Sequence, residues 1–95
     1  MAAYLIADIK IRDEKSYDEY RKLVAPTVEK YGGKFVVRGG AHETIEGDWT
    51  PGRIIVLEFE SVARAKEWHD SEEYAPALAI RTRAATTNAI IVEGA

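Results

Sequence analysis

Apolar and polar side chains alternate along the first part of the chain, from Tyr4 to Arg12. A period of two over such a segment is typical of a β-strand, whose successive side chains point to opposite faces. Three later segments are also rich in the apolar and β-branched residues that strands favour, and turn residues border them. They run from Lys34 to Arg38, from Arg53 to Glu60 and from Thr87 to Val92. We therefore expect four strands.

Between the first two strands the period changes to that of a helix. Apolar residues recur at intervals of three or four, which places them on one stripe of a helix: Tyr17, Tyr20, Val24, Val28 and Tyr31. Asp13 can cap the first turn, or Ser16 can with Glu19 completing a capping box. The pair Gly32–Gly33 supplies the left-handed end. We expect one helix between these signals.

A second helical region follows the third strand. Ser61 can cap it, and its first apolar positions are Val62, Ala65 and Trp68. Asp70–Ser71 interrupts the pattern, and helical spacing resumes from Glu72 to Ala84. The order strand, helix, strand, strand, helix, strand is that of an α+β ferredoxin-like fold. We expect a single domain over residues 1–95, with one four-stranded antiparallel sheet, both helices on one face, and the first and third strands central.

The two faces of this sheet differ in character. The set expected under the helices is Leu5, Ala7, Ile9, Ile11, Phe35, Val37, Ile55, Leu57 and Phe59. The opposite set is Tyr4, Ile6, Asp8, Lys10, Val36, Arg38, Ile54, Val56 and Glu58. Leaving its aliphatic members in water would forfeit about 1.5–3 kcal/mol each. We therefore expect a homodimer in which two sheets pack face to face around a partly polar cavity.

Composition and charge narrow the classes of protein. The chain has 46% hydrophobic and 31% charged residues and a net charge of −3, with the two signs interspersed. No basic cluster is present to neutralise phosphates, which argues against nucleic-acid binding. The apolar run from Met1 to Ala7 has no basic leader and is interrupted by Asp8, so we expect neither a signal peptide nor a membrane span. The absence of cysteine fits a cytoplasmic protein.

Three charged residues on neighbouring strands are the candidate catalytic groups: Asp8, Arg38 and Glu58. The alternation places them on the face opposite the helices. Two carboxylates beside a guanidinium could hold a general base at a raised pKa, suited to proton abstraction near neutral pH. The alternative is a structural ion network that fixes the register of a dimer.

Candidate substrate-binding residues come from the turn-rich loop 41–52 and from the second helical region: His42, Glu46, Trp49, Tyr74 and Arg81. The rigid donor fork of Arg81 suits a carboxylate or enolate oxygen. In the alternative, Trp49 plugs the loop and Arg81 pairs with Glu72 or Glu73. Only two histidines are present, and metal sites usually need three or four ligands. We expect no metal and no cofactor.

Several motifs resemble the family known as domain of unknown function 1330 (DUF1330). They are Arg38-Gly39-Gly40, Glu46-Gly47-Asp48-Trp49, Arg53 with Val56-Leu57-Glu58-Phe59, Ser71-Glu72-Glu73-Tyr74 and Arg81. The resemblance extends from Tyr4 to Gly94, although His69 stands where an aromatic residue such as Tyr is expected. It implies a ferredoxin-like protomer that dimerises as an α/β barrel, as in cofactor-free monooxygenases and muconolactone isomerase. It implies no particular reaction.

Two classes of function remain open. The first is a cofactor-independent enzyme that performs proton-transfer, monooxygenase-like or isomerase-like chemistry on a small anionic or oxygenated organic molecule. The second is a non-catalytic homodimer, ligand-binding or stress-related, that uses the same cavity. An enzyme needs at least one of Asp8 and Glu58 accessible from the cavity, whereas a binding protein tolerates both being paired with Arg38.

Overall fold

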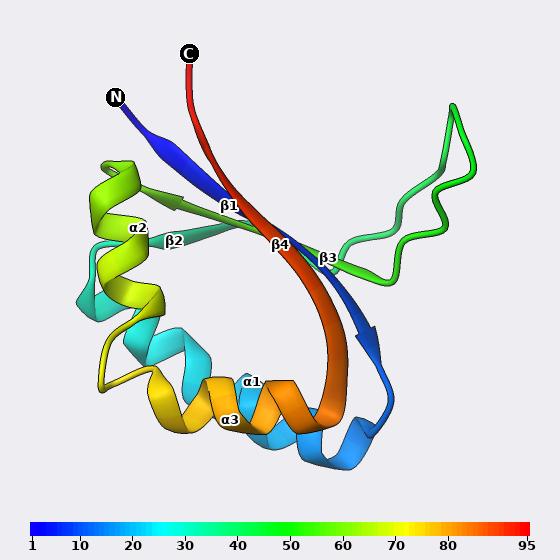
Figure 1. Cartoon of the computed structure of the whole chain (residues 1–95), viewed down its shortest axis with the longest axis horizontal. Coiled ribbons are helices and arrows are strands. Elements are labelled where there is room, and N and C mark those ends of the chain that lie inside the picture. The colour runs from blue at the N-terminus through cyan, green and yellow to red at the C-terminus, as the bar shows by residue number, and fades with distance from the viewer.

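The computed structural model describes residues 1–95 and contains four strands and three helices (Figure 1). In chain order these are β1 (Ala3–Ile11), α1 (Glu14–Lys30), β2 (Lys34–Arg38), β3 (Arg53–Phe59), α2 (Val62–His69), α3 (Ala75–Ala84) and β4 (Ala85–Glu93). The expected α+β ferredoxin-like arrangement is confirmed. The second helical region is two helices, separated where Asp70–Ser71 interrupts the apolar spacing.

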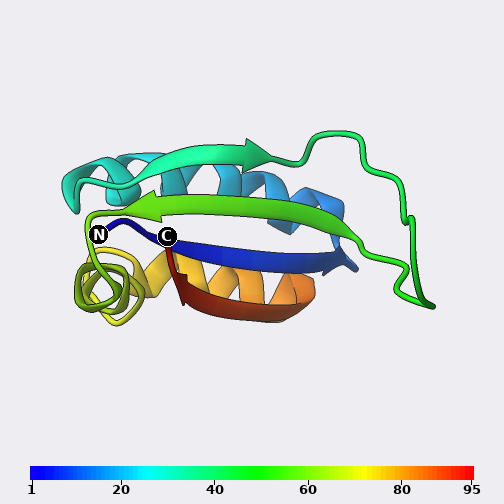
Figure 2. The same cartoon turned by 90° about the horizontal axis from the view of Figure 1, so that it is seen from above.

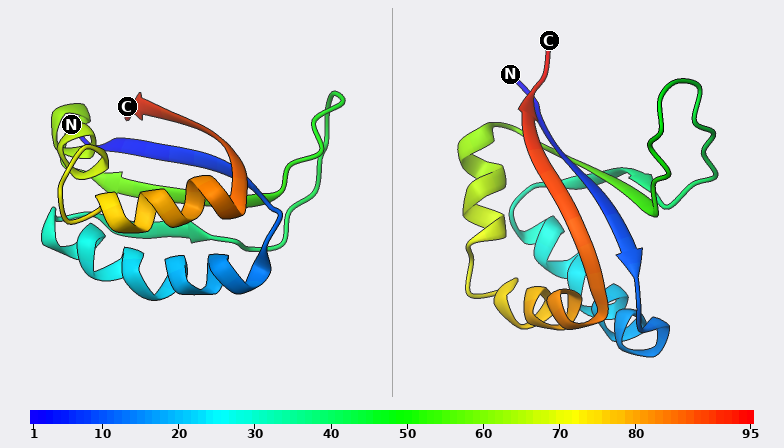
Figure 3. Two further views of the ribbon diagram at one scale, coloured as in Figure 1. Left: turned by 60° about the horizontal axis from the view of Figure 1, so that its bottom comes forward. Right: turned by 45° about the vertical axis from the view of Figure 1, so that its right-hand side comes forward.

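The four strands form one antiparallel sheet in the order β2-β3-β1-β4. The first and third strands are therefore central, as expected. In Figure 2 the sheet lies in front and the helices lie behind it. Helices α1 and α3 run side by side on that covered face (Figures 1 and 3). Every second residue of β1, beginning at Ala3 and ending at Ile9, is buried on the helix side of the sheet.

The core between sheet and helices is strongly aromatic. Its largest fully buried side chains are Trp68, Tyr17, Tyr74, Phe59, Ile9 and Val28. The ring centroids of Trp68 and Tyr74 are 4.0 Å apart, and those of Phe59 and Trp68 are 5.7 Å apart. Such close aromatic pairs add to the stabilisation from buried area alone. The tyrosines of the α1 stripe thus serve mainly as core residues.

Two side chains cap the helices at the expected places. Asp13 accepts a hydrogen bond from the backbone N–H of Ser16 at 3.2 Å, so Asp13 is the N-cap of α1. Ser61 accepts one from the backbone N–H of Arg64 at 3.0 Å and caps α2. Gly32 follows α1 with φ of 75°, a conformation that glycine adopts without strain.

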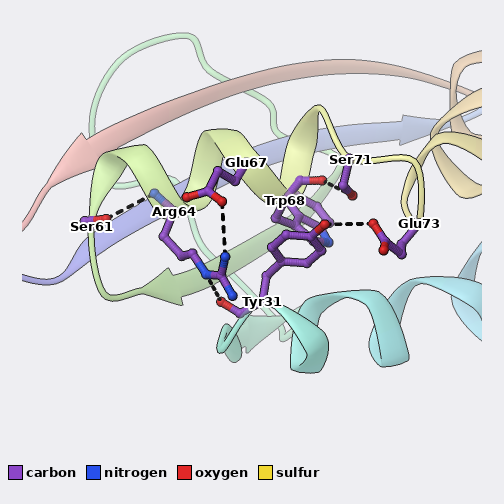
Figure 4. A network of polar contacts seen from close by, with 7 residues as sticks. All are labelled: Tyr31, Ser61, Arg64, Glu67, Trp68, Ser71 and Glu73. Atoms are coloured by element: carbon purple, nitrogen blue, oxygen red, sulfur yellow. Dashed lines mark hydrogen bonds and ion pairs between the residues drawn. The ribbon is translucent and has the colours of Figure 1, made fainter.

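A polar network joins the end of α1 to α2 and to the segment before α3 (Figure 4). Arg64 donates from Nε to the backbone carbonyl of Tyr31 at 3.1 Å and pairs through Nη1 with Glu67 at 3.2 Å. The Tyr31 hydroxyl donates to Glu73 at 2.7 Å. The short helix α2 is thereby held at one end of the sheet.

The second strand contains a β-bulge that changes which side chains face the helices. Phe35 lies opposite Leu57, but Val37 lies opposite Val56 and Arg38 opposite Ile55. Val36 is the extra residue. Paired residues share a face, so Val37 lies on the uncovered face and Arg38 on the helix side. Simple alternation predicted the reverse for both, and that prediction was wrong because a bulge shifts the register by one residue.

None of the three helices combines the length and the apolar character needed to cross a membrane.

Candidate functional site

The sheet face that no helix covers, called the open face below, carries the first candidate site. From the strand pairing, it presents Tyr4, Ile6, Asp8, Val37, Ile54, Val56, Glu58, Asn88, Ile90 and Val92. A hollow of about 370 Å³ opens on it, lined by Ile6, Asp8, Trp49, Asn88, Ala89 and Ile90. The hollow is mostly apolar, with one carboxylate, one amide and one indole as its polar groups.

Asp8 is the charged group of this hollow, and both its oxygens are engaged. Oδ2 accepts from the indole N–H of Trp49 at 2.8 Å, and Oδ1 accepts from the backbone N–H of Gly52 at 2.8 Å. The hydrogen bond from Trp49 is the main cause that holds the pKa of Asp8 below its usual range, and the bond from Gly52 acts in the same direction. Partial burial opposes both bonds. Asp8 is thus an ionised acceptor that anchors a loop, and a weak proton acceptor.

That loop, from Gly39 to Gly52, extends away from the body of the molecule between β2 and β3 (Figure 3). Its residues 41–50 are all exposed. Trp49 turns back from it to reach Asp8, so its side chain borders the hollow on the open face. Trp49 also borders a second hollow of about 250 Å³, inside the loop, whose lining includes His42, Glu46 and Ile54. Three predicted binding residues therefore lie together.

The predicted catalytic group of Asp8, Arg38 and Glu58 does not assemble. The bulge in β2 puts Arg38 on the opposite side of the sheet from Asp8. Glu58 lies on the open face, where its nearest cation is Lys34, with 3.9 Å between Nζ and Oε1. Arg38 takes part in none of the ion pairs of the structure. Of the alternatives left open for Arg38, an ion network with Asp8 and Glu58 is therefore not formed within one chain.

Tyr74 and Arg81 lie on the helix side and line neither hollow. The fully buried Tyr74 shares a hydrogen bond of 2.9 Å with the hydroxyl of Tyr20. Burial raises the pKa of both hydroxyls, and the charge of Arg81 opposes that rise in each. The Arg81 Nε is buried without a hydrogen-bond partner. Arg81 forms no ion pair with Glu72 or Glu73, and Glu73 instead binds Lys30 and Tyr31.

Metal-binding side chains are dispersed. No group of three or more histidine, cysteine, aspartate or glutamate residues is placed to hold a metal ion. His42 lies in the exposed loop with Glu46, and the Nδ1 atom of His69 lies 3.0 Å from the adjacent Asp70.

The model of one protein family matches almost the entire sequence. It is described as domain of unknown function (DUF1330), and it matches residues 2–95. The chain belongs to the DUF1330 family. The resemblance carried by the glycine, tryptophan and arginine motifs of the sequence is thereby confirmed. No curated protein matches the chain.

Solved structures share the fold of this DUF1330 protein at low sequence identity. A protein of unknown function from Rhodopseudomonas palustris has a TM-score of 0.80 at 21% identity, covering 99% of this chain and 82% of its own. A dimeric protein of unknown function with a ferredoxin-like fold, from Bacteroides fragilis, has a TM-score of 0.66 at 13% identity, with coverages of 98% and 96%. SnoaB, a cofactor-independent oxygenase from Streptomyces nogalater, has a TM-score of 0.59 at 8% identity, with coverages of 99% and 93%.

Strand β4 supplies lining residues that the sequence analysis missed. Asn88 lies opposite Asp8, and Ile90 lies opposite Ile6, across the pairing of β1 with β4. The residues predicted for the open face came only from the first three strands. The segment from Thr87 to Val92 was recognised as a strand, so placing it beside β1 would have found both residues in this DUF1330 chain.

Proposed function

We propose that this DUF1330 protein is a homodimer that binds a small organic molecule between the open faces of its two sheets. The observation that carries the proposal is the hollow beside Asp8 and Trp49, which lies on a sheet face that no helix covers. In one chain the hollow is open to water. A second sheet laid over it would close it into a cavity of the kind that binds small ligands.

The character of the open face supports a second copy as its cover. Ile90 is 61% exposed and Val92 is 42% exposed, and the neighbouring Ile6, Ile54 and Val56 are only half-buried. Apolar groups gathered on one face usually mark an interaction surface. The similar protein from Bacteroides fragilis is described as dimeric. A partner of the same sequence brings a matching apolar face, as a two-fold symmetric interface requires.

The state of Asp8 favours binding over proton abstraction. A general base needs a pKa near the working pH. Both oxygens of Asp8 already accept hydrogen bonds, and the pKa of Asp8 is lowered. The carboxylate instead fixes Trp49 as a wall of the hollow, so the site favours a molecule with a flat apolar part.

Cofactor-independent enzyme chemistry on a small anionic or oxygenated molecule is the second candidate. The shared fold with the oxygenase SnoaB is the observation that favours it. Glu58 would then be the candidate base, because it is the open-face carboxylate without two hydrogen-bond donors. The two candidates differ in the fate of a bound molecule. A binding protein releases the molecule unchanged, whereas the enzyme converts it in the presence of air. Mass spectrometry of the molecule after incubation with the protein distinguishes the two outcomes.

Filling the hollow tests the binding proposal. Asn88 is exposed and lines the hollow, so Asn88→Trp places an indole in it. We expect the fluorescence titration of the uncharged dye Nile red to show at least about tenfold weaker binding, or about 1.4 kcal/mol.

The matched control is Thr86→Trp, on the same strand and face but outside the lining. It should leave the titration unchanged. Equal dye affinity for Asn88→Trp and the wild type, with both dimeric by sedimentation, would contradict a ligand in this hollow.

A further inference from the structure

A cleft on the other side of the sheet has a different chemistry from the hollow on the open face. It lies between α1 and the strands β2 and β3. Three arginines line it, Arg21, Arg38 and Arg53, together with the aromatic side chains of Tyr17, Tyr20 and Phe35. No carboxylate contributes to its lining. A positively charged, aromatic cleft in a protein whose net charge is −3 requires an explanation.

Arg53 is the innermost of the three arginines. It begins β3 opposite the buried Ile9, on the helix side of the sheet. Its guanidinium packs against Gly39, where an added Cβ would come within 2.5 Å of Cζ. Its Nε is buried and has no hydrogen-bond partner. A buried donor left unpaired destabilises the protein, so a ligand that accepts from it gains a favourable contact.

Arg38 reaches the same cleft because of the bulge in β2. Its guanidinium lies over the ring of Phe35, 4.1 Å from the centroid. Neither Arg38 nor Arg53 has a carboxylate within ion-pair distance, and only Arg21 has one, Asp18 at 3.3 Å on the exposed surface of α1. The free protein therefore holds two guanidinium groups along one cleft, neither with an ion-pair partner.

We propose that this cleft is an anion site, in which Arg38 and Arg53 bind the carboxylate of a small organic acid. The planar donor forks of two guanidinium groups match the two oxygens of a carboxylate. The site is independent of the homodimer and of the open-face hollow, because it lies on the opposite side of the sheet. It can exist in one chain.

The size and lining of the cleft define the class of ligand. The enclosed space is about 20 Å³, about the room of one water, so it admits one oxygen of a carboxylate and the rest of the group lies at its mouth. The rest of the molecule must lie at the mouth, where Arg21 and Arg38 are exposed and adaptable. The half-buried ring of Phe35 favours an apolar or aromatic body there. An aromatic monocarboxylate such as benzoate has both parts.

Tyr17 adds a donor to this arrangement. Burial raises the pKa of its hydroxyl, with Tyr20 acting in the same direction and Arg53 opposing them. The hydroxyl therefore keeps its proton at neutral pH and remains a hydrogen-bond donor.

Titration with potassium benzoate, followed by nitrogen–proton correlation spectra, tests the site. Chloride replaces benzoate in the reference so that ionic strength is constant. We expect saturable shifts of the Arg53 side-chain Nε–H and of the Gly39 amide. Arg38→Gln should weaken binding at least about tenfold, equivalent to about 1.4 kcal/mol. Arg38→Lys keeps the charge but loses the fork, and should weaken it less.

Arg83→Gln is the matched control, since Arg83 is an exposed arginine of α3 outside the cleft. It should leave the benzoate affinity unchanged. Inorganic phosphate serves as a second probe without an apolar part and should bind more weakly. The proposal is overturned if benzoate gives no saturable shift at Arg53 or Gly39, if Arg83→Gln weakens binding as much as Arg38→Gln, or if phosphate binds more tightly than benzoate.

Discussion

Among the carboxyl groups, that of Glu73 has the pKa which the fold shifts most strongly. Lys30 donates to Oε2 and the Tyr31 hydroxyl donates to Oε1, both at 2.7 Å. These two bonds, that of Lys30 first, lower the pKa of Glu73 from 4.5 to about 2. Because the folded pKa lies below the unfolded one, the stabilisation is fully present above pH 4.5 and is lost as the pH falls toward 2.

Glu73→Gln should therefore lower the free energy of unfolding at neutral pH and flatten its decline below about pH 4.5. Urea unfolding at several pH values measures both effects. Glu72→Gln is the control, since Glu72 is exposed and makes no side-chain hydrogen bond or ion pair. An acid decline as steep in Glu73→Gln as in the wild type would show that Glu73 does not contribute to it.

Arg38 shows why single side chains were harder to predict than strands. The sequence marks β2 clearly, and its bounds are the predicted ones. Yet Phe35, Val36 and Val37 are three apolar residues in a row, so nothing in the pattern says which of them is extra. The bulge at Val36 is fixed by pairing with β3. The face of Arg38 follows from that pairing, which lies outside the segment itself.

At the scale of elements, the loop from Gly39 to Gly52 depends on one carboxylate for its position. Asp8 accepts two donors, one on each oxygen. Asp8→Asn replaces one oxygen by an NH₂ group, so either Trp49 or Gly52 faces a donor and loses its bond. We expect a loss of about 1 kcal/mol in the free energy of unfolding, since water reaches the site. Faster amide exchange across residues 41–52 should accompany it, measured by mass spectrometry.

Asp48→Asn is the matched control for this loop. Asp48 is exposed in the same loop, so its change to Asn removes a charge without removing a structural contact. Its amide exchange should equal that of the wild type. If Asp8→Asn and Asp48→Asn exchange at the same rate, the contact between Asp8 and Trp49 does not hold the loop.

Element types were more predictable than the course of this loop. The period of two and the helical stripe identify strands and helices because their causes are local. The break between α2 and α3 also has a local cause, because the hydroxyl of Ser71 donates to the backbone carbonyl of Trp68 at 2.7 Å, only three residues earlier. The loop is different, because its anchor joins Asp8 to Trp49, 41 residues apart. Such a contact depends on the folded sheet and leaves no periodic signal in the sequence.

At the scale of the molecule, the sheet separates two chemical environments. The open face carries an apolar hollow with an anchored carboxylate, and the helix side carries a cleft lined by three arginines, two of them without an ion-pair partner. Strict alternation along the strands puts Asp8 and Arg38 in one cavity and so predicts one mixed site. The bulge in β2 divides that site in two. In our proposal, only the environment on the open face depends on a second copy of the chain.

Ile90→Arg tests whether a second copy covers the open face. Ile90 is 61% exposed in one chain and lies at the hollow. In a two-fold symmetric dimer each interface residue occurs twice, so the substitution buries two unpaired positive charges. We expect the wild type to sediment at about twice the chain mass of 10.6 kDa, and Ile90→Arg to sediment as a folded monomer at the same micromolar concentration.

A matched substitution separates loss of the interface from the general effect of a new surface charge. Leu23 is 45% exposed on α1, a helix of the opposite side of the sheet. Leu23→Arg therefore adds the same charge to an apolar surface residue away from the open face, and it should remain dimeric. A dimeric Ile90→Arg variant, or dissociation caused equally by Leu23→Arg, would place the interface elsewhere. The hollow beside Asp8 and Trp49 would then remain open to water.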